Sequence, residues 1–254
     1  LQLQTHCGIT EESIREMEEE IHREVNEACE KAVAVGRPSP RLPAWEVYAP
    51  RSIRNVDPYS AKNVKNLGAI NAALHYILEK NPRAFVAGLD IGPYGSAFKS
   101  CKGLHAIHGD DRVLDMPLCE SAITGFSLGA SQVGGRPIVE FQFADFSTEA
   151  TTQIGLNCST WYFRSGKPAP LLFRLPCGGG ITLGAFHSGE FEGLWTRFPG
   201  LKVIYPVTPQ ECYEALVAGF HDPNPCIVLE HKLLYGGQSG DIDFDGDLEA
   251  VWRA

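Results

Sequence analysis

The sequence predicts a three-layer α/β/α domain with a parallel sheet over residues 60–232. Strand-like runs recur at "RAFVAGLDIG", "RPIVEFQF", "APLLFRL", "LKVIYP" and "PCIVLEH", and segments of helical length separate them. Runs that are apolar nearly throughout are typical of parallel strands whose two faces are both covered. In "SAKNVKNLGAINAALHYILEK" the apolar residues recur at helical spacing, which predicts the first of the covering helices.

Residues 1–35 predict a separate acidic amphipathic helix. In "TEESIREMEEEIHREVNEACEKAVA" a single apolar stripe carries Ile14, Met17, Ile21, Val25, Ala28 and Ala32. Thr10 is placed to cap this helix, and residues 1–31 hold nine glutamates against three basic residues. We expect a solvated helix that docks its stripe on a neighbour.

Two connectors complete the expected domain organisation. Residues 36–59 contain four prolines between positions 38 and 50, which predicts an extended linker. Residues 233–254 predict a second linker, leading to a C-terminal domain outside this sequence. Its "DIDFDGDLEAVW" imitates a calcium loop, but Trp252 stands where a bidentate glutamate is needed. Because the chain opens on Leu1 without an initiator methionine, we expect it to be a piece of a longer protein.

Composition excludes several classes of function. No run approaches the roughly 18 apolar residues that a membrane span requires. The net charge of −9 and the lack of a basic face argue against nucleic acid as a partner. The eight cysteines form no CxxC pair, and several lie in apolar runs, which predicts reduced thiols. We expect a cytoplasmic location, with the mitochondrial matrix as the alternative.

Three features carry the chemistry: Glu120 in "PLCESAITGF", the aromatic run "EFQFADF" at 140–146, and His187 in "FHSGEFEG". Each lies where a strand-like run gives way to a loop or helix, and ligand sites of parallel α/β sheets gather at the carboxyl ends of the strands. Plainer interpretations remain open from the residues alone. Glu120 could be a helix cap, and His187 a capping or surface residue.

The blocks "DRVLDMPLCESAITGFSLGAS", "VEFQFADFSTEATTQI", "YFRSG" and "FHSGEFEGLWTRFPGLKVIYPVTPQECYEALVAGFHDPNPCIVLEHKLLY" resemble, in order and spacing, the beta subunit of the thiamine diphosphate-dependent decarboxylating component of 2-oxo acid dehydrogenase complexes. The likeness covers roughly residues 65 to 235. "PLCE" with "QFADF" is most similar to the branched-chain (2-oxoisovalerate) enzymes. The resemblance implies the pyrimidine-binding domain of the thiamine diphosphate, transketolase-like fold.

The resemblance also implies an activity and a set of site residues. The activity is the oxidative decarboxylation of a branched-chain 2-oxo acid, with acyl transfer to lipoamide. Glu120 would hydrogen-bond the ring nitrogen of the aminopyrimidine, Phe146 would pack against that ring, and Leu118 would line its pocket. His187 would assist proton transfer during acylation of lipoamide.

Further cofactors and partners follow from the same resemblance. Magnesium and the diphosphate would be held by an alpha subunit or alpha-type domain, because this chain has no GDG motif. A potassium ion would be held by the backbone carbonyls of Ala169, Leu171, Gly219, Asp222 and Asn224. The partners would be a second beta-type domain and the lipoyl acyltransferase. The helix of residues 1–35 resembles the end of an alpha subunit, and we expect the isolated chain to be inactive.

Two residues depart from the family pattern. Leu89 in "GLDIG" replaces a glutamate that the family places there, and Gly189 replaces the glutamine that commonly follows the histidine and serine. Two alternative functions therefore stay open. One is a non-catalytic assembly module of the same fold, and the other is another enzyme of the transketolase superfamily, acting on sugar phosphates.

Overall fold

The computed structural model describes residues 8–37 and 43–253. These residues fall into two units, one within 1–42 and the other within 43–254, which are described separately.

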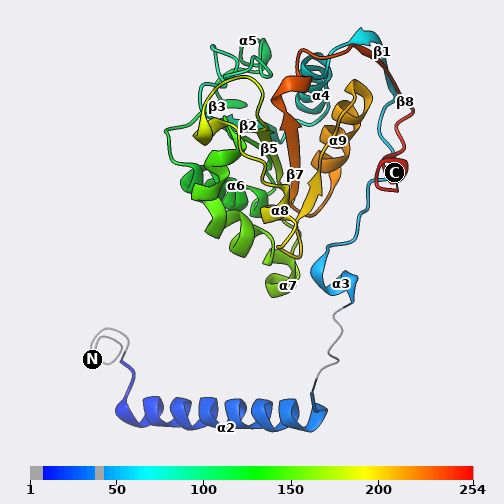
Figure 1. Ribbon diagram of the computed structural model, residues 1–254. Helices are drawn as coiled ribbons and strands as arrows, with labels where there is room; N and C mark the ends of the chain where they lie inside the picture. The colour runs from blue at the N-terminus through cyan, green and yellow to red at the C-terminus, as the bar shows by residue number, and fades with distance from the viewer. Residues whose placement is uncertain (1–7, 38–42, 254) are drawn as a thin grey trace. The chain divides into compact units, whose positions relative to one another are not determined.

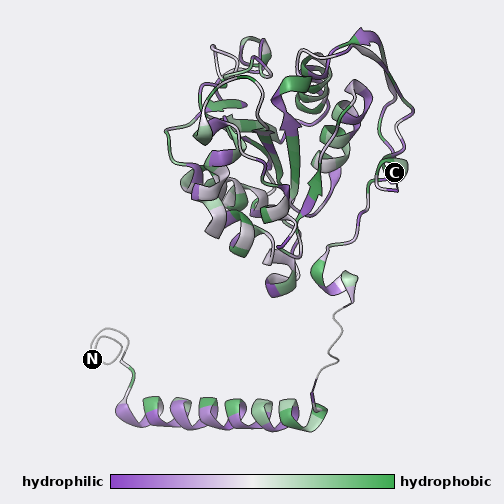
Figure 2. Ribbon diagram, viewed as in Figure 1, coloured by the Kyte–Doolittle hydropathy of each residue, from purple (hydrophilic) through white to green (hydrophobic). Residues whose placement is uncertain are grey.

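The first unit is the predicted acidic helix, α2 (Glu11–Val35). The Thr10 side chain caps it by accepting a hydrogen bond from the backbone N–H of Ser13 at 3.1 Å. Gly36 ends it with a φ of 80°, a positive value that glycine adopts at little cost because it has no Cβ. Hydrophilic and hydrophobic residues alternate along α2 (Figure 2). No residue of α2 is buried, so its apolar stripe is exposed.

The second unit is built on a six-stranded sheet in the order β3-β2-β4-β5-β7-β6 (Figure 1). Every neighbouring pair in this sheet is parallel, as the sequence predicted. The strands are β2 (Ala84–Gly88), β3 (Val113–Asp115), β4 (Arg136–Glu140), β5 (Leu172–Cys177), β6 (Lys202–Ile204) and β7 (Cys226–His231). The polypeptide crosses the sheet through helices between successive strands, which is how parallel strands are connected.

Helices cover both faces of this sheet. Figure 1 shows α4 (Asn66–Lys80) and α9 (Pro209–His221) on one side and α6 (Glu120–Gln132) on the other. Successive residues of a strand point to opposite faces of the sheet. Ile138 therefore packs in the cluster with α4 and α9, whereas its neighbour Val139 packs in the cluster with α6. Two cores therefore sandwich the sheet, which confirms the predicted three layers.

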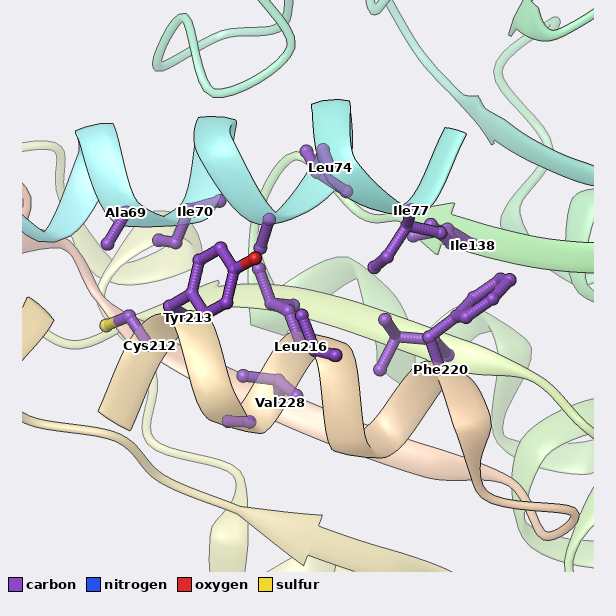
Figure 3. Close-up of a cluster of buried hydrophobic side chains, with 14 of the residues drawn as sticks. Ala69, Ile70, Leu74, Ile77, Ile138, Cys212, Tyr213, Leu216, Phe220 and Val228 are labelled. Carbon is purple, nitrogen blue, oxygen red and sulfur yellow. The ribbon is translucent and has the colours of Figure 1, made fainter. Parts of the chain in front are cut away.

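The α4–α9 core shows why these segments are helical. Its buried residues recur along each helix at three- and four-residue steps, and they interlock over β4 and β7 (Figure 3). Figure 3 labels Ala69, Ile70, Leu74, Ile77, Ile138, Cys212, Tyr213, Leu216, Phe220 and Val228. A capping box starts α9, in which the Thr208 side chain accepts from Glu211 N and the Glu211 carboxylate accepts from Thr208 N.

A small antiparallel sheet lies beside this core. It pairs β1 (Tyr59–Val64) with β8 (Gly240–Phe244), and the short helix α10 (Leu248–Val251) follows. The sequence predicted a linker over 233–254, whereas the structure has a strand and a helix there. The acids of the "DIDFDG" run point outward from β8, and Ile242 and Phe244 between them are buried in the α4–α9 core.

The other short elements are α3 (Ala44–Val47), α5 (Leu104–His108), α7 (Trp161–Ser165), α8 (Glu192–Trp195), η1 (Ala144–Ala150), the π-helical η2 (Thr152–Cys158), η3 (Ala185–His187) and η4 (Lys232–Leu234). In the described part of the chain no helix is both long and apolar enough to cross a membrane. Seven cysteines of that part are free thiols, of which Cys29 and Cys119 are exposed. Cys7 lies outside the described residues.

Candidate active site

The carboxyl ends of three neighbouring strands lie side by side, because β4, β5 and β7 are parallel and adjacent. Phe143 and Phe146 follow β4, His187 lies on the segment after β5, and Lys232 directly follows β7. Side chains more than 80 residues apart in sequence therefore lie at one edge of the sheet, which is the edge where α/β proteins bind their ligands.

An aromatic cluster occupies this edge. The rings of Phe143 and His187 lie 4.4 Å apart between centroids, and those of Phe146 and His187 lie 5.4 Å apart. Phe143 and Phe146 are separated by 5.6 Å, and all three pairs meet edge to face. The structure thus brings together Phe146 and His187, two of the residues that the sequence singled out.

Glu120 begins α6, which packs against η1, the segment that carries Phe146. The residue is only 7% exposed. Cys119 holds the N-cap position, so Glu120 does not cap the helix. Within residues 43–253 no hydrogen bond or ion pair engages its carboxylate, and none joins it to His187. The carboxylate oxygens are not among the fully buried polar atoms that lack a partner, so they keep some access to solvent and are free to bind a ligand.

The segment that carries His187 is tied to the rest of the site by its backbone. The N–H of Gly189 donates to Asp145 Oδ1 at 3.1 Å, and the N–H of Gly178 donates to the carbonyl of Gly189 at 3.0 Å. A Cβ on Gly189 would lie 2.3 Å from the Phe191 ring and 2.8 Å from Asp145 Oδ1. Only glycine permits this close approach.

Glu190 adds a second tether. Its carboxylate accepts a hydrogen bond from Tyr205 Oη at 2.9 Å and lies 3.4 Å from His231 Nε2. Tyr205 follows β6 and His231 ends β7, so Glu190 joins the His187 segment to two strands of the sheet.

A buried ion cluster supports the strand ends from beneath. Arg174 of β5 binds Glu230 of β7 with two hydrogen bonds of 2.8 Å, from Nε and Nη2, and also binds Glu140 of β4. Tyr235 Oη donates to Glu230 at 2.7 Å. The three charged residues are at most 3% exposed. Their pairing keeps the three strands in register at the edge that carries the aromatic cluster.

A family model described as the transketolase pyrimidine-binding domain matches residues 62–238, which is more than half of the chain. The chain belongs to this family. The match spans the six-stranded sheet and all three of the strand ends described above.

Two curated relatives show which class of enzyme subunit the chain is similar to. The chain is 39% identical to the 2-oxoisovalerate dehydrogenase subunit beta of Bacillus subtilis over 190 residues, covering 74% of this chain and 58% of that protein. It is 38% identical to a pyruvate dehydrogenase E1 component subunit beta of Staphylococcus epidermidis, covering 66% of this chain and 52% of that protein. The chain thus spans little more than half the length of these relatives.

A solved structure titled "Split gene transketolase, inactive beta4 tetramer" matches at a TM-score of 0.49 and 17% identity, covering 70% of this chain and 53% of that one.

Leu89 and Gly189 are the two residues of this pyrimidine-binding domain that depart from the family pattern, and the structure shows what each of them contacts. Leu89 packs against the apolar cluster on the α6 side, so a carboxylate there would be placed against hydrocarbon. The neighbouring Asp90 keeps a polar role, accepting a hydrogen bond from Gln142 Nε2 at 2.8 Å. Gly189, in place of the glutamine, donates to Asp145 as described.

Leu118 is 79% exposed, and nothing within this domain covers it among the described residues. Its predicted place in the cofactor pocket stays a prediction.

The residues of the predicted potassium site, Ala169, Leu171, Gly219, Asp222 and Asn224, are all buried near one end of the sheet. Several of their groups are already engaged: the carbonyl of Leu171 accepts from the N–H of Cys226 at 2.9 Å, and the Asp222 carboxylate binds Lys202. Elsewhere in the described residues, no group of three or more His, Cys, Asp or Glu side chains could hold a metal. The potassium site stays a prediction.

Sequence reasoning missed the ion cluster and Lys232. A signal was present, because a charged residue interrupts each of three apolar strand runs, in "IVEF", "LLFRL" and "VLEH". A charge in a strand that is covered on both faces must find a partner on a neighbouring strand, so the three interruptions together indicate a buried cluster.

Proposed function

We propose that this domain provides the pyrimidine-binding half of a thiamine diphosphate-dependent 2-oxo acid dehydrogenase that acts on a branched-chain 2-oxo acid and transfers the acyl group to lipoamide. The observation that carries the proposal is the gathering of Phe146 and His187 at the strand ends, beside a helix that begins with the buried acid Glu120. The names of relatives that match at 36–39% identity support the reaction class.

The residues present fit the pyrimidine end of this cofactor. Glu120 offers a buried acid that lacks a partner within the described chain, and a heterocycle nitrogen would satisfy it. The half-buried ring of Phe146 offers an apolar face for the pyrimidine, and Leu118 would form the outer wall. The cofactor, when bound, supplies the electron sink that decarboxylation needs.

His187 would move protons in the acyl transfer that follows. Its ring contacts both Phe143 and Phe146, which restricts how the imidazole can turn, and its half-buried position leaves a side toward incoming groups. The tethers from Asp145 and Glu190 hold the backbone on which this histidine lies.

The remaining half of the site would come from partners. An alpha subunit or alpha-type domain would hold the diphosphate and magnesium, and a second beta-type domain would complete a dimer. The lipoyl acyltransferase would receive the acyl group, and potassium would lie near Asp222.

The test replaces Glu120 by alanine in the complete enzyme, assembled with its alpha partner. Decarboxylation of 3-methyl-2-oxobutanoate, measured as released carbon dioxide, should fall by at least about 100-fold, the scale of a lost proton-transfer group. The matched control is Glu149→Ala, because Glu149 is an exposed acid of η1. Near-normal turnover of the Glu120 variant would refute the assignment.

Leu89 favours one alternative, a non-catalytic assembly module, because an apolar side chain packs against the core at the position where the family resemblance implies an acid. Isothermal titration of thiamine diphosphate with magnesium into the complete protein separates the two functions, since only the enzyme predicts saturable binding. Turnover of sugar phosphates without any turnover of branched 2-oxo acids would instead identify a transketolase-like enzyme.

A further inference from the structure

Lys232 is the first residue of η4, immediately after β7. It is only 4% exposed, and its ammonium has no hydrogen-bond partner among the described residues. Other lysines of this domain differ: Lys62, Lys80 and Lys202 each form an ion pair with an aspartate. A buried ammonium without an acceptor is strongly unfavourable, so an acceptor from outside the chain would stabilise the protein.

Asp145 and Glu190, the two carboxylates whose charges act on Lys232, form no hydrogen bond or ion pair with its ammonium. Asp145 accepts hydrogen bonds from the N–H of Gly189, and Glu190 is engaged by Tyr205 and His231. Burial lowers the pKa of the Lys232 ammonium, and the negative charges of Asp145 and Glu190 offset only part of that effect. The two carboxylates nonetheless make the surroundings more favourable for a cation than burial alone would.

The ammonium faces the aromatic cluster. It lies 5.6 Å from the centroid of the Phe143 ring, and the same ring lies 4.4 Å from His187. Phe143 is half-buried, and its ring contacts His187 and also faces the ammonium. Because the ammonium is buried, a ligand can reach it only if a side chain that covers it, such as Phe143, changes its rotamer.

We propose that Lys232 is the binding residue for the carboxylate of a small branched monocarboxylic acid, whose alkyl part packs against Phe143 and Phe146. This inference rests on the proposed function for its choice of ligand, since a branched 2-oxo acid joins a carboxylate to an apolar group. The ammonium forms a charge-assisted hydrogen bond with the acid, and the aromatic rings cover the alkyl chain.

The test uses isovalerate, which has the carboxylate and the branched chain but no 2-oxo group and therefore does not react. Its dissociation constant is measured by titration calorimetry on the complete enzyme with its alpha partner and cofactor. We expect Lys232→Met to weaken binding by at least about tenfold, the scale of a charge-assisted hydrogen bond. Lys167→Met, at an exposed lysine, is the matched control and should bind as the unsubstituted protein does.

Isovaleramide, the neutral amide, shows whether Lys232 recognises the carboxylate or the alkyl chain. We expect it to bind weakly, and with the same affinity to the unsubstituted protein and to Lys232→Met. A measurement on the unsubstituted protein covers the case in which the variant does not fold. With 13C-labelled lysine, the pKa of Lys232 followed by NMR should rise when isovalerate binds and stay unchanged with isovaleramide.

Equal affinity of the unsubstituted protein and Lys232→Met for isovalerate, or a Lys232 pKa indifferent to it, would overturn the inference. Failure of this inference can be distinguished from failure of the proposed function. Decarboxylation that depends on Glu120 together with isovalerate binding indifferent to Lys232 removes only this inference. Binding that depends on Lys232 without any decarboxylation removes only the proposed activity.

Discussion

The carboxylate of Asp145 accepts a hydrogen bond from the backbone N–H of Gly189 at 3.1 Å. Asp145 immediately precedes Phe146, and Gly189 lies two residues after His187. One hydrogen bond therefore joins the two segments whose side chains meet in the aromatic cluster. Since loops after separate strands are otherwise free to move independently, this bond helps to keep the phenyl and imidazole rings in contact.

Asp145→Ala should loosen the segment that carries His187. The hydrogen bond is made to a charged acceptor, so hydrogen exchange at the Gly189 amide should become at least about tenfold faster. Asp145→Asn is the control, because the amide oxygen can still accept from Gly189 and should retain most of the protection. Unchanged exchange in the alanine variant would show that the tethers from Glu190 and Gly178 are enough to hold the segment.

Arg174→Met should destabilise the domain strongly. The substitution leaves the carboxylates of Glu140 and Glu230 buried without their cation, which costs about 3 to 5 kcal/mol of unfolding free energy. Urea unfolding followed by circular dichroism measures the loss. Lys62→Met removes the exposed pair with Asp241 and should leave the unfolding midpoint close to the original. Similar midpoints for the two variants would contradict the importance of the buried cluster.

Gly200→Ala should unfold the domain far more readily than Gly166→Ala. Both glycines have positive φ angles, 94° and 66°, so both variants carry the strain of an alanine at positive φ, roughly 1 to 2 kcal/mol. A Cβ on Gly200 would also lie 1.9 Å from the carbonyl oxygen of Ser159, whereas nothing lies within 4 Å of one on Gly166. The difference between their thermal midpoints isolates the clash. Equal midpoints would show that the backbone at Ser159 moves aside freely.

His221 should make the domain less stable in mild acid. Burial, reinforced by the positive charge of Arg136, lowers the pKa of His221 to about 4. In the unfolded chain this histidine takes a proton near pH 6.5, whereas the folded domain excludes it until about pH 4. The unfolded state therefore binds more protons, and stability falls as the pH drops through this window, by on the order of 2 to 3 kcal/mol.

Urea midpoints at pH 7.5 and pH 5 measure this dependence. His221→Gln should flatten it, because the glutamine does not titrate, whereas His22→Gln, at an exposed position of α2, should leave it unchanged. A pH dependence that persists in the His221 variant would assign it to another group.

Local patterns made much of the architecture predictable. The run of apolar residues through β5 and the helical spacing of Ile70, Leu74 and Ile77 are properties of short stretches, and each follows from burial on two faces or on one. Glu120 and His187 could be proposed because they follow such stretches. The strand β8 was missed because its alternation covers only five residues and its acids resemble a polar linker.

What the sequence by itself determined is the three-layer parallel fold, and with it the edge of the sheet at which we expect the chemistry, because periodicity and the direction of parallel strands are local properties. Only the tertiary structure decided that Phe143 contacts His187, that Arg174 pairs with Glu140 and Glu230, and that Lys232 is buried with its ammonium facing the Phe143 ring. These contacts depend on the order in which β4, β5 and β7 lie side by side. That order is set by how the whole set of helices and strands buries its apolar surface, and no single stretch of sequence contains it.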